Sequence, residues 1–261
     1  MKRLITALGL LALAFYLIFF APQAVFWIAA LGTGLLCYRE FDALVDAHGV
    51  PSPGLVGAIV GIFVLFGPQF SWMRNSFLPA LIFAVIVLAI RALRLTDLRE
   101  ILPYIACAML GALYTFAPWG FAIDLRRESV HLLFFALALN WAGDTVAYYI
   151  GRKFGRHRLA PVVSPKKSWE GAIASVIGSI VFGVLYLGYF LPQIAKWEII
   201  SMAFLGNIAG QFGDLAESAI KRGAGVKDSG NLLPGHGGIL DRLDSSLFAL
   251  PVVLLFYNLC R

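Results

Sequence analysis

Charged residues are scarce in this chain of 261 residues, because Asp, Glu, Lys and Arg together make up only 14% of it. Hydrophobic residues make up 60%, and the mean hydropathy is +0.81. A soluble protein of this length needs a polar shell that this composition cannot supply. The composition therefore excludes an ordinary soluble domain and predicts an all-α protein, a polytopic transmembrane helical bundle.

Cysteine and histidine are also rare, which excludes several kinds of site. The three cysteines lie far apart, each inside or at the end of an apolar run: Cys37, Cys107 and Cys260. Neither a disulfide framework nor a thiolate metal site is indicated, and we expect them to be small buried side chains. The histidines lack the spacing of metal ligands. The sequence also has no GxxxxGK[ST] motif, so any nucleotide pocket is not a P-loop.

Long apolar runs are abundant instead. Each is long enough to cross a hydrocarbon core of ~30 Å, which predicts about nine spans. The candidate spans are roughly 4–20, 23–38, 53–70, 77–95, 101–119, 130–150, 171–191, 198–220 and 246–260. The first run could alternatively be a secretory signal peptide. The connector 39–53 is amphipathic and is interpreted as a short interfacial helix.

Basic residues are distributed unequally between alternate loops. One side of the predicted membrane collects 16 of the 21 Lys and Arg residues, and the other side has five. Because cytoplasmic loops retain Lys and Arg, the N-terminus, the loop 152–168 and the glycine-rich segment 218–244 are all expected to face the cytoplasm. The expected location is the bacterial inner (cell) membrane. Membrane lipids are the expected surroundings, no nucleic-acid partner is expected, and a homodimer is left open.

Two of the predicted spans carry polar stripes. In the span 198–220 the polar residues recur at steps of four and three, which places them on one helix face: Asn207, Gln211, Asp214, Ser218 and Lys221. In the span 130–150 they recur at steps of four: Asn140, Asp144 and Tyr148. A polar stripe in a membrane must face protein or water, so the two helices are predicted to enclose a polar cavity that opens to the cytoplasm. The alternative for Asp214 is a buried, hydrogen-bonded side chain that only joins helices.

A basic motif, SPKKS, precedes the span that begins near Gly171. Ser164 and Pro165 match the pattern of a helix N-terminus, whose free N–H groups attract anions. Lys166 and Lys167 would then oppose the helix dipole unless a phosphate bound between them. The alternative is a basic anchor that contacts anionic lipid headgroups.

The segment 218–244, SAIKRGAGVKDSGNLLPGHGGILDRLD, holds seven charged residues, one histidine and six glycines within 27 residues. Asp241 and Asp244 are three residues apart, so on a helix their carboxylates share a face and could share a cation. Together with Asp214 they form a set of hard oxygen donors that suits Mg²⁺. His236 lies between glycines and either contacts a phosphate or closes a turn.

The order of these residues resembles the signature of the phosphatidate cytidylyltransferases, also called CDP-diacylglycerol synthases. The matching positions are Ser218, Lys221, Arg222, Lys227, Asp228, Gly230, Pro234, His236, Gly237, Gly238, Asp241, Arg242 and Asp244. Upstream, GDTVAYYIGRKFG (143–155) and SPKKSWEG (164–171) extend the resemblance. The N-terminal half fits the family without strong motifs of its own.

The resemblance implies that CTP and phosphatidic acid react to give CDP-diacylglycerol and pyrophosphate. The attacking lipid phosphate is already ionised at neutral pH, so the site must neutralise charge and align two polyanions rather than supply a strong base. Mg²⁺ is the expected cofactor, and a second cation is left open. Asp214 and Asp241 are the principal expected metal ligands, with Asp244 and Asp144 as further ligands or orienting groups.

Basic side chains are expected to bind the phosphates. The predicted partners of nucleotide and lipid phosphates are Lys221, Arg222, Lys227 and Arg242, of which Lys221, Lys227 and Arg242 are catalytic candidates with Asp214 and Asp241. Ser164, Lys166, Lys167 and Ser168 are expected to bind the triphosphate or pyrophosphate. The remaining substrate-binding candidates are Ser218, Asp228, His236, Gly237 and Gly238.

The chain is predicted to divide into a scaffold of transmembrane helices, residues 1–128, and a catalytic region, residues 129–261. Three alternatives remain: a lipid or polyprenol kinase or a cytidylyltransferase for another lipid phosphate, an ion-coupled transporter, and a lipid-binding scaffold. A transporter is disfavoured because its binding residues usually gather near the membrane midplane.

Overall fold

The protein packs as two units. In the computed structural model, residues 2–74, 76–233, 235 and 237–261 are described, with side chains from residue 8 onward. The first unit comprises Met1–Ile123 with Gly223–Asp241, and the second comprises Asp124–Arg222 with Arg242–Arg261. Residues 223–241 of the glycine-rich segment therefore pack with the N-terminal helices. The functional division at residue 128 stays a prediction.

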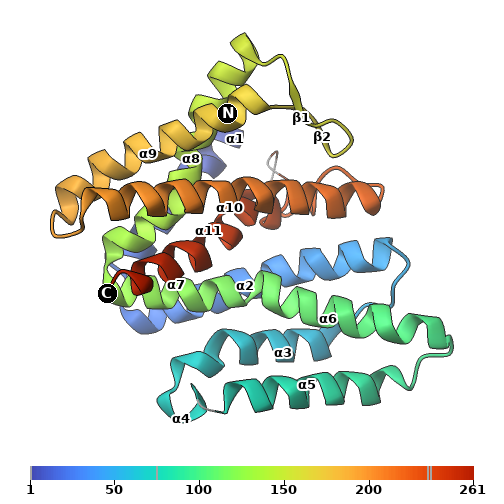
Figure 1. Cartoon of the computed structure of the whole chain (residues 1–261). Coiled ribbons are helices and arrows are strands. Elements are labelled where there is room, and N and C mark those ends of the chain that lie inside the picture. Colours follow the sequence, from blue (N-terminus) through green and yellow to red (C-terminus); the bar gives the residue numbers. More distant parts are fainter. Residues whose placement is uncertain (1, 75, 234, 236) are drawn as a thin grey trace. The chain divides into compact units, whose positions relative to one another are not determined.

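Helices dominate both units (Figure 1). In chain order the elements are α1 (Lys2–Phe19), α2 (Gln23–Ala47), α3 (Gly54–Phe66), η1 (Gly67–Gln69), α4 (Ser71–Arg74), α5 (Phe77–Ala92), η2 (Leu98–Glu100), α6 (Ile101–Thr115), α7 (Ala117–Glu128), α8 (Val130–Phe154), β1 (Arg158–Ala160), β2 (Ser164–Ser168), α9 (Trp169–Phe190), α10 (Lys196–Gly223) and α11 (Leu240–Leu259). The nine predicted spans all fall on helices, although the span 101–119 crosses from α6 into α7, so the prediction that the apolar runs are helical is confirmed.

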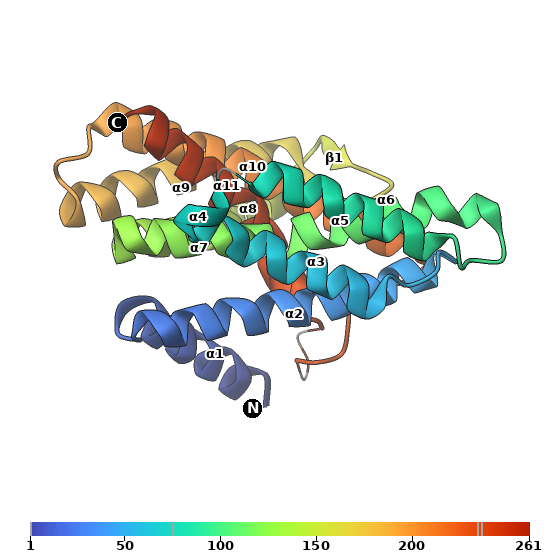
Figure 2. The same cartoon turned by 90° about the horizontal axis from the view of Figure 1, so that it is seen from below.

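In the first unit, α6 packs against α2, α3 and α5 (Figures 1 and 2). Close packing depends on glycines in α3. A Cβ at Gly61 would collide with the Phe116 ring, and one at Gly57 would collide with the Tyr38 hydroxyl. Small residues at a helix interface let backbones and rings approach closely, as expected for helices packed within a membrane.

The amphipathic connector 39–53 does not form a separate helix. Residues 39–47 continue α2 without a break, and the chain leaves the helix at His48 and Gly49. The interpretation as an independent interfacial helix was wrong. Apolar side chains on the same face of this last part of α2, including Phe41, Leu44 and Val45, are buried and hold it in the unit.

In the second unit, α8 and α9 pack along their lengths and are joined by the antiparallel hairpin β1–β2 (Figure 1). The hairpin pairs Arg158 with Ser168 and Ala160 with Ser164. The predicted helix start at Ser164 and Pro165 was therefore wrong, because these residues belong to β2. The cap is Ser168, whose backbone is extended and whose Oγ accepts the N–H of Gly171 at 3.2 Å.

Exposed apolar side chains on the helices indicate lipid-facing surfaces. On α9 the exposed residues recur at steps of four: Ile173, Ile177, Val181 and Leu185. On α5 the same spacing exposes Leu78, Ile82, Ile86 and Ile90. Such stripes would be unfavourable in water and are favourable against hydrocarbon. Together with the composition, they identify an integral membrane protein.

Within the described residues, four helical segments are long and apolar enough to cross a membrane: Gln23–Ala47, Leu98–Glu128, Val130–Phe154 and Trp169–Phe190. Three further apolar helices are shorter. Both α10 and α11 are long enough, but their charged residues lower their hydropathy. Two of the charged residues on α10, Asp214 and Lys221, belong to its polar stripe.

Candidate active site

A buried amide network joins the helices of the second unit. Asn207 on α10 is fully buried, and its Nδ2 donates to Asn140 Oδ1 on α8 at 3.2 Å and to the Ser175 and Ser179 hydroxyls on α9 at 3.1 and 2.8 Å. Its Oδ1 accepts from Gln211 at 2.7 Å. The two predicted polar stripes therefore face each other, with α9 beside them.

We expect Asn207→Ala to destabilise the protein by about 2 kcal/mol, because the change leaves several buried polar groups without their partner. Thermal unfolding in detergent, followed by circular dichroism, measures the effect. Asn258→Ala, which shortens an exposed asparagine on α11, is the matched control and should be neutral. Equal unfolding temperatures for the two variants would show that the network does not stabilise the unit.

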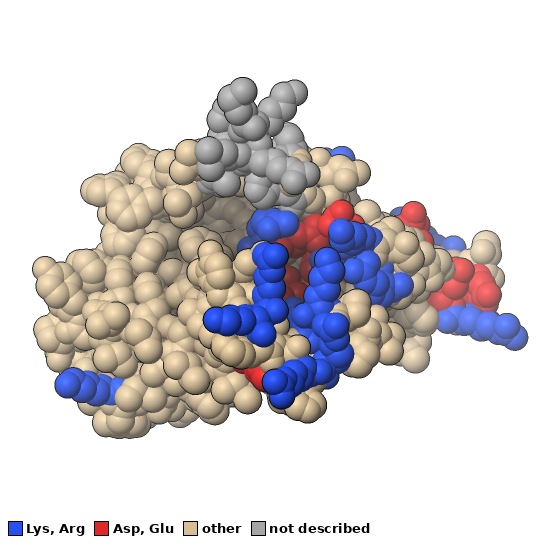
Figure 3. Space-filling view, turned by 90° about the horizontal axis from the view of Figure 1, so that it is seen from above, with Lys and Arg blue, Asp and Glu red and all other residues tan. Residues whose placement is uncertain are grey.

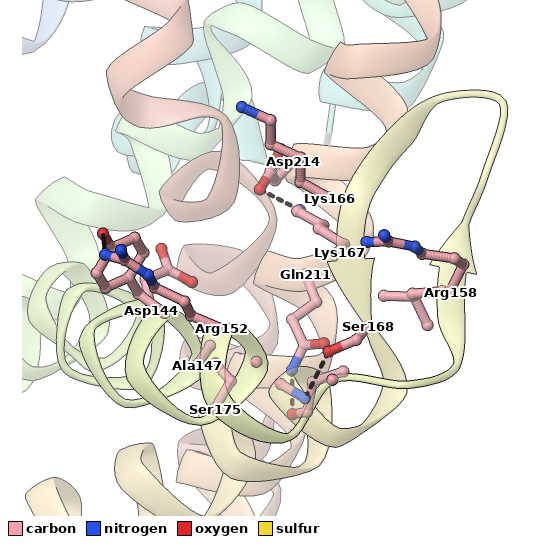
Figure 4. A pocket seen from close by; sticks show the side chains of 16 residues that line it. Asp144, Ala147, Arg152, Arg158, Lys166, Lys167, Ser168, Ser175, Gln211 and Asp214 are labelled. Carbon is pink, nitrogen blue, oxygen red and sulfur yellow. Dashed lines mark hydrogen bonds and ion pairs between the residues drawn. The ribbon is translucent and has the colours of Figure 1, made fainter.

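Directly beside this network lies a cavity of about 680 Å³ (Figure 4). Both predicted stripes contribute to its wall, and the hairpin closes one side. Its charged and polar lining residues are Asp144, Tyr148, Arg152, Arg158, Lys166, Lys167, Ser168, Ser175, Gln211 and Asp214. Four cations against two carboxylates give the wall a net positive charge, which suits a polyanionic ligand.

Lys167 and Asp214 meet in this cavity. The Lys167 ammonium forms an ion pair with Asp214 Oδ2, and both side chains are about 30% exposed. The Asp214 Oδ1 accepts a hydrogen bond from Ser218 at 3.3 Å, one turn further along α10. Asp144 is close enough to both Asp214 and Lys167 for their charges to act on its carboxyl group. The structure thus brings together residues that the sequence placed in three separate motifs.

The hairpin that carries Lys166 and Lys167 is held at its base. His157 and Glu170 form an ion pair between Nδ1 and Oε1 at 2.7 Å when the imidazole is protonated, and the His157 N–H lies 3.3 Å from the same oxygen. The Trp169 N–H donates to the His157 carbonyl at 3.0 Å. These contacts, with the Ser168 cap, fix where the two lysines enter the cavity.

Asp244, on α11, belongs to the same electrostatic cluster. Burial raises the pKa of its carboxyl to about 7, and the charge of Asp214 raises the pKa as well. The Ser245 N–H, which donates to Asp244 Oδ1 at 2.6 Å, and the charges of Lys221 and Lys167 act in the opposite direction. An acid whose charge is this unfavourable is a natural partner for a cation.

This shift predicts that stability in metal-free buffer falls as pH rises. Between the unfolded pKa of about 3.9 and the folded pKa of about 7, the folded protein binds a proton at Asp244 that the unfolded chain has lost. Raising the pH through this window therefore costs stability. In EDTA, the unfolding temperature of Asp244→Asn relative to the native protein should be higher at pH 8 than at pH 5. A relative unfolding temperature independent of pH would contradict the prediction.

The carboxylates fit a magnesium ion bound jointly with substrate. Among the described residues, no group of three His, Cys, Asp or Glu side chains is arranged to hold a metal by itself. Mg²⁺, however, is commonly held by one or two carboxylates with waters and substrate phosphates as the other ligands. Asp214, with Asp144 or Asp244 beside it, offers such a donor set, and a purely oxygen environment disfavours zinc.

Lys221, a predicted partner of the substrate phosphates, is buried in the second unit. Its ammonium forms an ion pair with Glu217, one turn earlier on α10, and both side chains are buried. Glu217 was missed in the sequence, although an acid four residues before a lysine on a helix is a recognisable signal. A buried Lys–Glu pair gives Lys221 a fixed position near Asp244, on whose carboxyl its charge acts.

Residues 223–241 of the glycine-rich segment lie in the first unit. Asp241 Oδ2 accepts the N–H groups of Ser229 at 2.9 Å and Gly238 at 2.8 Å, so this carboxylate organises the segment that precedes α11. Gly237 has a φ of +78°, and a Cβ there would lie 2.7 Å from the same oxygen. Glycine is therefore required at this position.

The other predicted residues of the segment are placed as follows. Exposed side chains are those of Arg222, Lys227, Asp228 and Arg242. Gly238 is buried. His236 and Pro234 lie outside the described residues.

Three functional candidates were missing from the sequence-based set. Arg152 and Arg158 line the cavity from α8 and β1, and only their membership in a basic loop signalled them. The third is Glu40 on α2, a buried carboxylate that contacts the glycine-rich segment.

Much of the molecular face in Figure 3 carries uncharged side chains, and charged ones occur in groups. On this face, charge is thus confined to small areas.

Comparison with known proteins gives a consistent result. A sequence model of the "Cytidylyltransferase family" matches residues 1–260. A protein of Staphylococcus saprophyticus called phosphatidate cytidylyltransferase is 37% identical over 209 residues, 77% of each chain. Proteins of the same name from Staphylococcus aureus (strain COL) and Staphylococcus haemolyticus are each 34% identical over 84% of each chain.

Proposed function

Since the chain belongs to the cytidylyltransferase family, we propose that it transfers CMP from CTP to phosphatidate and releases pyrophosphate. The product is CDP-diacylglycerol, a precursor in phospholipid biosynthesis. The observation that carries the proposal in the structure is the cavity of the second unit, where Lys167 pairs with Asp214 within a ring of cations. Such a lining matches a nucleoside triphosphate with its counterion.

The cationic wall binds the phosphates of CTP. Arg152 and Arg158 can each donate two parallel hydrogen bonds to phosphate oxygens, whereas Lys166 and Lys167 act as compact charges. Binding of the nucleotide draws Lys167 toward the phosphates and makes the Asp214 oxygens available to a cation. The ion pair therefore holds both partners in place before substrate arrives.

The reaction needs alignment and charge neutralisation. A phosphate oxygen of phosphatidate forms a bond to the α-phosphorus of CTP, and the bond from that phosphorus to the oxygen of the β-phosphate breaks, so the electron pair leaves with pyrophosphate. No proton has to be removed from the attacking phosphate, because it is ionised at neutral pH. Lys167 and its neighbouring cations stabilise the charge on the departing pyrophosphate.

Asp214 is the central metal ligand in this proposal, with Asp144 and Asp244 as further ligands or orienting groups. Asp241 is retained as a second principal ligand on the strength of the family signature. When bound, Mg²⁺ supplies positive charge to the phosphate oxygens of the nucleotide. Lys221, Lys227, Arg222 and Arg242 remain proposed partners of the lipid and nucleotide phosphates.

We further propose about nine spans, an N-terminus in the cytoplasm and a cavity open to the cytoplasm of a bacterial cell. The unequal distribution of basic residues supports this orientation, since 16 of 21 fall on one side. CTP is made in the cytoplasm, so the site must be reached from there. The orientation is tested by introducing single cysteines into the loops of the protein and labelling them in intact cells.

The reaction is tested by supplying purified protein with Mg²⁺ and CTP labelled at the α-phosphate, with and without phosphatidic acid. We expect label in the lipid and equimolar pyrophosphate release only when phosphatidic acid is present. In a parallel reaction with CTP labelled at the γ-phosphate, label in the lipid would instead identify a lipid kinase. Pyrophosphate release that does not depend on the lipid would contradict the proposal.

A further inference from the structure

Glu40 on α2 connects a helix near the N-terminus to the start of α11, about 200 residues later in the chain. Its side chain is only 7% exposed. The Oε1 atom accepts the N–H of Ile239 at 2.9 Å, and Oε2 accepts the N–H of Leu240 at 2.8 Å and the Ser229 hydroxyl at 2.9 Å. All of these residues lie in the first unit.

Glu40 and Asp241 accept hydrogen bonds from the same short segment. Ser229 gives its hydroxyl to Glu40 and its N–H to Asp241 Oδ2, so it touches both carboxylates. Three consecutive N–H groups at the start of α11 are divided between them: Gly238 donates to Asp241, whereas Ile239 and Leu240 donate to Glu40. The free N–H groups of a helix start attract negative charge, and here the protein itself supplies that charge.

The glycines of the segment are shaped around Glu40. A Cβ at Gly238 would collide with Glu40 Oε2 and with the Ser229 hydroxyl, and a Cβ at Gly230 would lie 2.8 Å from Glu40 Oε1. Burial of a carboxylate is costly unless hydrogen bonds compensate it, and Glu40 has three such bonds to this one segment. The hydrogen bonds of Glu40 therefore stabilise the glycine-rich segment.

We propose that Glu40 is a positioning residue: with Ser229 it holds the glycine-rich segment against α2 and fixes the start of α11, and so sets the orientation of the Asp241 carboxylate. Loss of the Glu40 charge loosens the segment while Asp241 itself remains. The consequence for catalysis rests on the proposed function, but the consequence for the segment does not.

The test uses Glu40→Gln in the full-length protein. The amide keeps the side-chain volume, but it has one acceptor oxygen, and its NH₂ group would face N–H or O–H donors. Asp42→Asn is the matched control. Asp42 lies two residues further along α2 and accepts the Ser52 hydroxyl at 2.6 Å and the Gly54 N–H at 3.2 Å, so the same kind of contact is lost away from the glycine-rich segment.

Two readouts are measured. Hydrogen exchange in the absence of substrate should be about tenfold faster for peptides covering 229–240 in Glu40→Gln and unchanged there in Asp42→Asn. In the cytidylyl-transfer assay, Glu40→Gln should lower kcat about 10- to 100-fold and raise the Mg²⁺ concentration for half-maximal rate, with the KM for CTP within about twofold. Asp42→Asn should keep the native kcat, Mg²⁺ requirement and KM for CTP.

Several results would overturn the proposal. One is unchanged exchange over 229–240 in Glu40→Gln. Another is faster exchange with a native kcat and a native Mg²⁺ requirement. If Glu40→Gln does not fold, Ser229→Ala is used instead, because it removes one hydrogen-bond donor to Glu40. The same hydrogen-exchange and kinetic measurements are made on it. Unchanged exchange and unchanged kinetics would overturn the proposal. If the native protein transfers no CMP, the proposed function fails, and the exchange measurement alone decides whether Glu40 holds the segment.

Discussion

Replacing Asp214 with Asn is expected to lower kcat by about 1,000-fold or more while the fold is retained. The substitution removes the charge that pairs with Lys167 and one carboxylate oxygen from the donor set near Asp144 and Asp244. Folding should survive because the asparagine Oδ1 can still accept the hydrogen bond from Ser218. Lipid labelling from CTP and the unfolding temperature in detergent measure the two effects.

Asp124→Asn is the matched control for this prediction. Asp124 forms an ion pair with Arg127 at 3.2 Å on α7, and it does not line the cavity. The control loses one carboxylate and one ion pair, so it isolates the effect of position. If both variants had similar kcat values, the catalytic role of Asp214 would have to be abandoned.

Replacing Lys167 with Met is expected to lower kcat/KM for CTP by about 100-fold, which corresponds to a loss of about 2.7 kcal/mol of transition-state stabilisation. Methionine keeps the length and apolar stem of the side chain but has no charge. The change leaves Asp214 without the ammonium group and the phosphates without one cation. Steady-state kinetics at saturating Mg²⁺ and phosphatidic acid measure the loss.

Lys153→Met controls for the loss of a lysine charge from the same basic region. Lys153 lies over the Phe154 ring, 5.3 Å from its centre, and does not line the cavity. Its replacement should change kcat/KM less than about twofold, since Lys153 is exposed and salt screens an exposed charge. Comparable losses in both variants would mean that the general basicity of the loop, rather than the cavity, supports catalysis.

The helices and the polar cavity could be predicted from the sequence, because both follow from the spacing of apolar and polar residues. Apolar runs of sufficient length specify helices whatever their neighbours are, and steps of three and four place Asn140, Asp144, Asn207 and Asp214 on inward faces. The structure confirms that these faces meet. Spacing along one helix was enough to predict which residues share a surface.

The hairpin was missed because its strands, of three and five residues, are too short to show a strand pattern in the sequence. Ser164 followed by Pro165 satisfies the pattern of a helix start, but Arg158–Ala160 supplies a partner strand and Ser168 provides a cap four residues later. Pairing satisfies backbone groups that a helix would otherwise have to satisfy. The two lysines nevertheless reach the cavity, so the predicted contact with an anion survives the change in secondary structure.

Glu40 could not be predicted from spacing. Its partners Ser229 and Leu240 lie 189 and 200 residues further along the chain, and nothing in the amphipathic sequence around Glu40 indicates them. Only the packing of the first unit brings these residues together. Glu217, by contrast, lies one helical turn from Lys221 and could have been found.

The central claim is that the cavity of the second unit holds CTP together with a divalent cation. Equilibrium binding of labelled CTP to the purified protein, without phosphatidic acid and with or without Mg²⁺, tests it most directly. The account predicts saturable binding that requires Mg²⁺, is weakened about tenfold or more in Lys167→Met, and is native in Lys153→Met. Equal CTP affinity in all three proteins, or binding indifferent to Mg²⁺, would contradict it.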